Sequence, residues 1–553
     1  MRTLPGVLLA LAVALGLPAA AEAQQLTYVP PNIAIIMVYH GSGDPHWAFK
    51  AHEFADAVKE LTQLSFDEDY YHVEVFPAEF ETMGLVKVTN VNTGKTYVIH
   101  QVLAMNPAEH EEDETELAYA FREAVQFTDH GQKGFIAVIP AFVDRGGEHQ
   151  TQEIPALLWA LEHEYKMPKF AVHYEPFGLV SWDRENNYGV APKLAVANIE
   201  YEAQKPLVGP NQEGQPQGVF ANFKTLGDVL KYAAQKHELG VLEIAFGTLR
   251  IGFWKDFVAN MEYVLRGVVN YLNEKYGADI KLLQGAWVVQ NGQVVFKVTK
   301  PGEAYFYAFN NPAIGVKKWG SLGSRWDIRY MVFKDIMKEF YQEGVRYVLV
   351  YPYQTVTGIT DRMLFEGNPE NGPEGQEPPF YGSPKTEGKY AILRHFHGVL
   401  LAETKADVEK YIATYQNSEW LGNGTYNFAI YMDTRIYEIP PGTLGDWQQQ
   451  PMYIMYVRRA LMDAPNGVQE LAKVFTSYVD TYMAEWLTQW LAGRQLYHLA
   501  TAQSAFKPPT TQGQQQVTVQ PSSQYPNVVQ VTPVNPLVIL LALPLALALA
   551  RRR

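Results

Sequence analysis

The stretch "NIAIIMVYHGSGDP", residues 32–45, decides the fold at the start of the chain. Its apolar run shows no alternation with polar residues, which is typical of a strand buried on both faces of a parallel sheet. The run ends at His40, and glycines at 41 and 43 allow the backbone to turn sharply. We therefore predict a buried strand that presents an imidazole at its C-terminal end.

A second stretch, "GFIAVIPAFVDRGGEHQTQEIP" at 134–155, repeats this arrangement and leads to His149. Between the two stretches, Ala51, Phe54 and Val58 follow helical spacing, "YHVEVFPAEF" at 71–80 is strand-like, and 86–102 is typical of a hairpin. Strands that alternate with helices predict an α/β fold with a doubly wound parallel sheet.

The same order returns from residue 240, with "GVLEIAFG", a helical pattern, a hairpin signal at Asn291–Gly292 and "VRYVLVYPYQTVTG" at 345–358. Phe246 lies 206 residues after His40, and Pro352 lies 212 residues after Pro140. We predict two tandem related domains, a first half over 31–205 and a second half over 236–500, in which Phe246 and Asp361 replace the histidines. Two unrelated α/β domains are the alternative.

Composition narrows the classes of function. The net charge of −14 argues against nucleic-acid binding, which depends on cationic contacts to phosphate. The 553 residues include no cysteine, which excludes disulfides, thiolate metal sites and cysteine nucleophiles. A metal would therefore need His, Asp, Glu, carbonyl or water ligands.

The two ends of the sequence predict where the protein is located. Residues 1–23 have the pattern of a secretory signal peptide that ends in Ala21-Glu22-Ala23. Residues 503–533 form a Gln-, Thr- and Pro-rich stalk, and the apolar segment 534–553 ends in three arginines, as a membrane anchor would. We predict an extracytoplasmic body anchored to the cell membrane; an uncleaved N-terminal helix and a processed C-terminal sorting signal are alternatives.

Three side chains follow the carboxyl ends of predicted strands in the first half: His40, Glu79 and His149. Ligands of doubly wound sheets bind at that edge, so these side chains can converge there. Two imidazoles and a carboxylate suit a divalent ion such as Co²⁺, Ni²⁺, Fe²⁺ or Zn²⁺. For each histidine, a packed ring or a cap is the alternative interpretation.

A resemblance sharpens this prediction. "VYHGSGDP" at 38–45 resembles the "HGSRDP" pattern of the class II tetrapyrrole chelatases, the sirohydrochlorin cobalt, nickel and iron chelatases. "GGEHQTQEIP" at 146–155 resembles their second pattern, and "VEVFPAEFET" at 73–82 resembles their Glu-bearing second strand. Gly43 replaces the usual arginine, and an acidic insertion occupies 110–116. The chain resembles the long, duplicated form, in which both histidines lie in the N-terminal half.

The resemblance implies a lyase-type chelatase without an organic cofactor. His40 and His149 would hold or deliver Co²⁺, Ni²⁺ or Fe²⁺ over a tetrapyrrole in the cleft between the halves, with Glu79 as base or third ligand. Phe246 would cover the macrocycle. Candidates to bind the peripheral carboxylates of the substrate are Arg145, Arg250, Lys317, Lys318 and Arg325.

Two further classes of function stay open. The same fold could capture a tetrapyrrole or a metal at the surface without catalysis, with an uptake transporter as partner. A structural surface protein that has kept only the fold is the third hypothesis, and the retained histidines argue against it.

Overall fold

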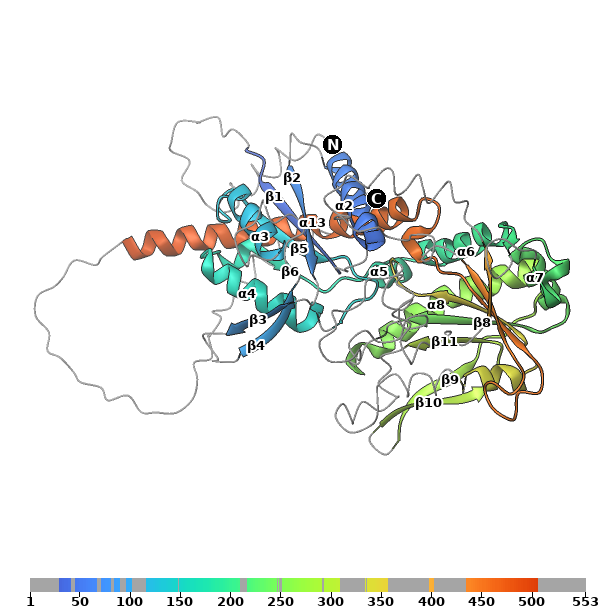
Figure 1. The fold of residues 1–553 in the computed structure, drawn as a ribbon. Helices are drawn as coiled ribbons and strands as arrows, with labels where there is room; N and C mark the ends of the chain where they lie inside the picture. Colours follow the sequence, from blue (N-terminus) through green and yellow to red (C-terminus); the bar gives the residue numbers. More distant parts are fainter. Residues whose placement is uncertain are drawn as a thin grey trace, which may run out of the picture. The chain divides into compact units, whose positions relative to one another are not determined.

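The computed structural model describes residues 29–40, 45–66, 71–80, 84–89, 96–101, 116–147, 149–208, 216–245, 247, 251–290, 293–308, 334, 336–356, 397–401 and 434–505 (Figure 1). The predicted signal peptide, most of the stalk and the anchor lie outside these ranges. Within them, no helix combines the length and hydropathy needed to cross a bilayer. The membrane location therefore stays a prediction.

The first sheet is built from β1 (Asn32–His40), β2 (His72–Phe80), β5 (Gly134–Pro140) and β6 (Val172–Tyr174). Its order is β2-β1-β5-β6, and all neighbours are parallel, which confirms the predicted mixed α/β fold with a parallel sheet. β6 has only three residues. It lies between two prolines, Pro168 and Pro176, which cannot donate to a strand ladder.

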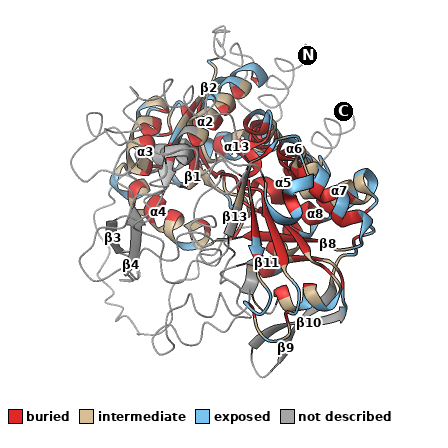
Figure 2. Cartoon of the chain, turned by 45° about the vertical axis from the view of Figure 1, so that its right-hand side comes forward, coloured by how far each residue is buried: buried red, intermediate tan, exposed pale blue. Residues whose placement is uncertain are grey.

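Helices α2 (Pro45–Ser65), α3 (Glu116–Phe127) and α4 (Ile154–Glu164) belong to this half, and the hairpin of β3 (Gly84–Thr89) and β4 (Thr96–Gln101) forms a separate small sheet. Ala51, Phe54 and Val58 of α2 are all buried, as their helical spacing predicts. In Figure 2, α3 shows buried residues interspersed with partly buried and exposed ones, as expected of a helix with one side against the core.

The second sheet has the order β11-β8-β12-β15-β14-β13-β7. Its parallel part consists of β8 (Leu239–Ala245), β11 (Ala304–Ala308), β12 (Tyr347–Pro352) and β15 (Met452–Tyr456). Three antiparallel strands extend it, namely β14 (Arg435–Ile439), β13 (His397–Leu401) and the two-residue β7 (Leu207–Val208). β7 lies just after the first half in sequence, in the segment that joins the two halves.

The parallel strands of the two sheets correspond, since β11-β8-β12-β15 matches β2-β1-β5-β6 in order of appearance. Val38 pairs with Pro140, and Ile244 pairs with Pro352. The next N–H donates back to Val38 in one sheet and to Ile244 in the other, each over 2.6 Å. The hairpins differ, because β9 (Gln284–Gln290) and β10 (Gln293–Lys300) precede the second strand, whereas β3 and β4 follow it. Duplication stays a prediction.

Helices of each half pack against the other half. Helices α5 (Leu179–Glu185) and α6 (Val190–Ala203) of the first half contact α8 (Ile251–Tyr276) of the second half, as does α7 (Leu226–Gln235) from the segment between the halves. In return, α13 (Gly467–Ala505) brings Phe475 against Phe54 and Trp490 against Phe135.

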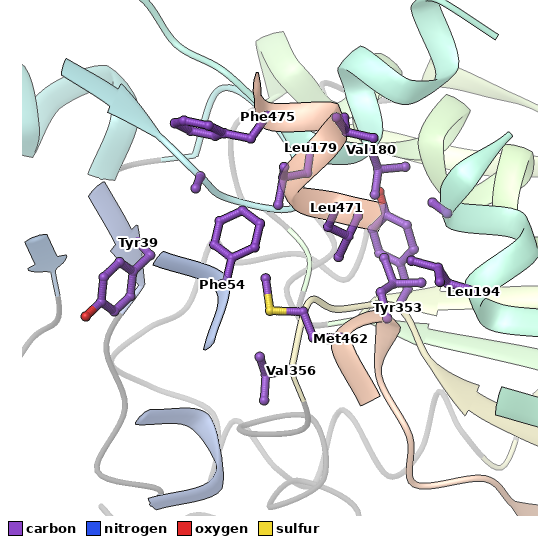
Figure 3. Close-up of a cluster of buried hydrophobic side chains, with 14 of the residues drawn as sticks. Tyr39, Phe54, Leu179, Val180, Leu194, Tyr353, Val356, Met462, Leu471 and Phe475 are labelled. Atoms are coloured by element: carbon purple, nitrogen blue, oxygen red, sulfur yellow. The ribbon is translucent and has the colours of Figure 1, made fainter. Parts of the chain in front are cut away.

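These contacts give a core cluster that spans both halves, while a second cluster of buried residues lies within the second half. Figure 3 shows side chains of α2, α5, α6 and α13 in the same cluster as residues of the second half, among them Phe54, Leu179, Leu194, Tyr353, Met462 and Phe475. Residues up to Tyr497 form a single compact unit, and His498 begins a second. The boundaries at 31–205 and 236–500 therefore stay predictions about sequence repeats.

Candidate functional site

His40 is the last residue of β1. The strand is buried throughout Ile33–Val38, and His40 at its C-terminal end is partly buried. The Ala141 N–H donates to the Val38 carbonyl oxygen (2.6 Å), which brings the chain that leaves β5 alongside the end of β1. The ring of Phe142 consequently lies 6.0 Å from the ring of His40, centre to centre.

His149 begins a π-helical turn, His149–Glu153, which continues directly into α4. π-Helical turns are rare and occur frequently at functional sites. Pro155 lies in the first turn of α4, where its missing N–H costs no hydrogen bond. The motif "HQTQEIP" therefore places His149 one turn before a helix whose start is fixed by proline.

The structure brings His40 and His149 together. Their ring centres lie 5.2 Å apart at an interplanar angle of 70°, and Phe142 lies 6.2 Å from His149. With metal–nitrogen bonds of about 2.0–2.1 Å, two imidazoles on one tetrahedral ion have centres about 5.2 Å apart. The observed separation therefore fits a shared ion, and it is also that of an edge-to-face aromatic pair.

Glu153 is a site residue that the sequence analysis missed. Its Oε2 is hydrogen-bonded to Nδ1 of His149, with both side chains mostly buried. Donation from Nδ1–H to a carboxylate fixes the tautomer and leaves the lone pair on Nε2 for a ligand, as in carboxylate–histidine–metal arrangements. The spacing of four residues, one turn apart on the chain, is the signal that could have identified it.

The remaining predicted residues are only partly described. Glu79 lies on β2, where its backbone pairs in register with Tyr39, the residue before His40; its side chain lies outside the description. Among the side chains that are described, no three His, Asp or Glu are arranged to hold a metal ion. Other predicted residues outside the described ranges are Phe246, Arg250, Lys317, Lys318, Arg325 and Asp361.

Arg145, one of the candidate cations, has carboxylate partners within the protein. Its guanidinium pairs with Asp256 of α8 (3.1 Å) and with Glu185 of α5. Its neighbour Asp144 accepts hydrogen bonds from the Asn260 amide (2.6 Å) and the Tyr353 hydroxyl (2.7 Å). The loop before His149 is therefore bonded to the second half.

Two acidic side chains near this loop have perturbed pKa values. Burial raises the pKa of Asp144 to about 7, against the opposing effect of its hydrogen bonds from Asn260 and Tyr353. Burial likewise raises the pKa of Glu243, a fully buried residue of β8, well above its ordinary value. The Tyr351 hydroxyl donates to Glu243 over 3.0 Å. Both carboxyls favour the neutral form because the protein interior disfavours charge.

Comparisons with known proteins add little. No protein-family model and no curated protein matches the chain. Among solved structures, it is similar to the crystal structure of the sirohydrochlorin chelatase SirB from Bacillus subtilis subspecies spizizenii in complex with cobalt. The match has a TM-score of 0.26 and 14% identity, and covers 59% of this chain and 77% of that chain. We draw neither fold nor function from a likeness at this TM-score.

Proposed function

We propose that the protein is a metal chelatase that inserts Co²⁺, Ni²⁺ or Fe²⁺ into a tetrapyrrole such as sirohydrochlorin. The observation that carries the proposal is the 5.2 Å separation of the His40 and His149 ring centres at the carboxyl edge of the first sheet. Two residues distant in sequence meet there, each within a motif that resembles those of the class II chelatases.

The chemistry assigns a role to each residue. The neutral imidazoles of His40 and His149 offer lone pairs to the dication, which is a substrate of the reaction. As the ion passes from the imidazoles to the macrocycle nitrogens, two pyrrole N–H protons leave, and each imidazole lone pair that the ion has released can accept one of them. Glu153 orients His149, and Glu79 would serve as base or third ligand.

Absorption spectroscopy tests the proposal. Purified protein is mixed with sirohydrochlorin and Co²⁺, and the spectrum is followed for metallation. We expect His40→Ala and His149→Ala to abolish metallation. His72→Ala is the matched control, because His72 lies on β2 of the same sheet at the opposite end, in register with Asn32, and should metallate normally. Equal rates in all four proteins would refute the assignment.

The same assay separates the second candidate function. A shift of the tetrapyrrole spectrum on binding, without metallation, would indicate a surface protein that captures a tetrapyrrole or metal for an uptake transporter. The ring contact of His40 with His149 fits this candidate equally, because capture of a metal needs the same ligand pair without the transfer of the ion.

The proposed location is outside the cytoplasm, with residues 1–23 as the export signal and 534–553 as the anchor. The apolar composition of both segments and the terminal arginines support it. Fractionation of cells tests it: the full chain should sediment with membranes and be accessible to external protease, and a chain ending at residue 533 should be released.

A further inference from the structure

Gln150, the residue after His149, has hydrogen bonds at both polar atoms of its side chain. Gln150 is fully buried; its Nε2 donates to the carbonyl oxygens of Asp144 (3.0 Å) and Phe177 (2.7 Å), and its Oε1 accepts from the Gly146 N–H (2.8 Å). Because Gln150 belongs to the π-helical turn that His149 begins, the position of that turn follows the position of residues 144–146.

Those residues are bonded to α8 of the second half. Asp144 accepts from Asn260, and Arg145 pairs with Asp256. Ser181 connects the two α8 residues, since its hydroxyl donates to Asp256 (3.2 Å) and accepts from Asn260 (2.8 Å). The loop clamp consists of five residues: Asp144, Arg145, Ser181, Asp256 and Asn260.

The backbone of the 144–146 loop also lies directly against α8. Gly146 has a φ of +89°, in the left-handed region that favours glycine, and a Cβ there would lie 2.0 Å from the ring of Phe253 on α8. The loop thus passes directly over the first turn of α8, with no room for a side chain between the two. A displacement of α8 would displace the loop.

We propose that the second half, which lacks the histidines, positions His149 for the metal through the loop clamp and Gln150. Asp256, Asn260 and Gln150 are positioning residues, since they act on His149 through the 144–146 loop and touch no substrate. The inference rests on the proposed function, in which His40 and His149 share an ion. It gives the second half a task that its own sequence does not reveal.

Two measurements test the inference in the full chain. The first is the histidine Cε1–H NMR spectrum of the metal-free protein, and the second is Co²⁺ affinity by competition together with the visible spectrum of bound Co²⁺. The variants are Asp256→Asn and Gln150→Leu. The matched control is Glu262→Gln, which removes an exposed ion pair with Arg266 on the same helix.

We expect both variants to shift the His149 resonance, leave that of His72 unchanged, and weaken Co²⁺ binding by about ten- to a hundredfold. Glu262→Gln should change none of these. If Gln150→Leu does not fold, Asp256→Asn, which keeps the shape of the side chain, carries the test.

The outcomes also separate the inference from the proposed function. Unchanged Co²⁺ affinity and an unmoved His149 resonance in Asp256→Asn, with affinity lost in His149→Ala, would overturn the clamp and leave the metal site standing. Wild-type protein that binds no Co²⁺ through His149 would overturn the proposed function, and the resonance measurement would still decide whether the clamp positions that ring.

Discussion

Replacement of Asp144 by asparagine should change how the stability of the protein depends on pH. Burial raises the pKa of this carboxyl from 3.8 to about 7. Between these values the folded protein keeps a proton that the unfolded chain releases, so the free energy of unfolding falls as pH rises and levels off above pH 7. A difference of about three pKa units corresponds to about 4 kcal/mol.

Asparagine cannot ionise but keeps an oxygen that accepts from Asn260 and Tyr353. The wild type should therefore lose about 4 kcal/mol relative to Asp144→Asn between about pH 4 and pH 8. Urea unfolding at a series of pH values gives the free energies, provided that the slope against urea is the same in both proteins.

Asp228 is a comparison residue whose contribution to stability should depend on pH in the opposite direction. It accepts N–H bonds at the start of α7, which hold the pKa of its carboxyl below the ordinary value despite some burial. Stability from Asp228 is present above the unfolded pKa and is lost as pH falls, the opposite sign to Asp144. A wild-type minus Asp144→Asn difference that stays constant across this range, or grows with pH, would refute the assignment of a buried neutral carboxyl.

Three further outcomes are expected. Glu153→Ala should weaken Co²⁺ binding about ten- to a hundredfold by competition titration, because His149 loses the carboxylate on Nδ1; unchanged affinity would contradict this role. Arg459→Met should cost about 3–5 kcal/mol in urea unfolding, because the buried Glu202 carboxylate loses its cationic partner and keeps only the Thr434 hydroxyl; adding Glu202→Gln should recover much of that loss. Phe475→Ala should cost about 3–5 kcal/mol, because the Phe475 ring packs on Phe54 of the other half. Both halves should then unfold in one transition at lower denaturant. Separate transitions by tryptophan fluorescence and circular dichroism would argue for independent halves.

The local parts of the fold could be predicted from the sequence. Strands β1, β5, β8 and β12 are apolar runs whose burial on both faces leaves a signal in composition alone, and helix α8 carries Trp254, Phe257 and Met261 at the spacing that buries them. The hairpin of β9 and β10 was indicated by Asn291–Gly292, whose turn chemistry is local.

The parts that were missed depend on distant residues. Nothing local in α13 indicates that Phe475 and Trp490 pack on the first sheet, since any apolar face would serve an amphipathic helix equally well. The convergence of His40 and His149 was predicted, because both follow carboxyl ends of strands of one sheet, whereas Glu153 was missed although its spacing of four residues from His149 was visible in the sequence. Glu243 did leave a signal, as one acidic residue inside an otherwise apolar strand.

The return of α13 to the first sheet has a consequence for how the polypeptide matures. While the nascent chain emerges, the contacts that Phe54 makes with Phe475 and Phe135 makes with Trp490 cannot form until α13 is synthesised, although Phe135 can already pack on His173. Part of the apolar surface of the first half is therefore exposed to solvent or to a chaperone during this interval, and both sheets acquire their final packing together only when α13 is present.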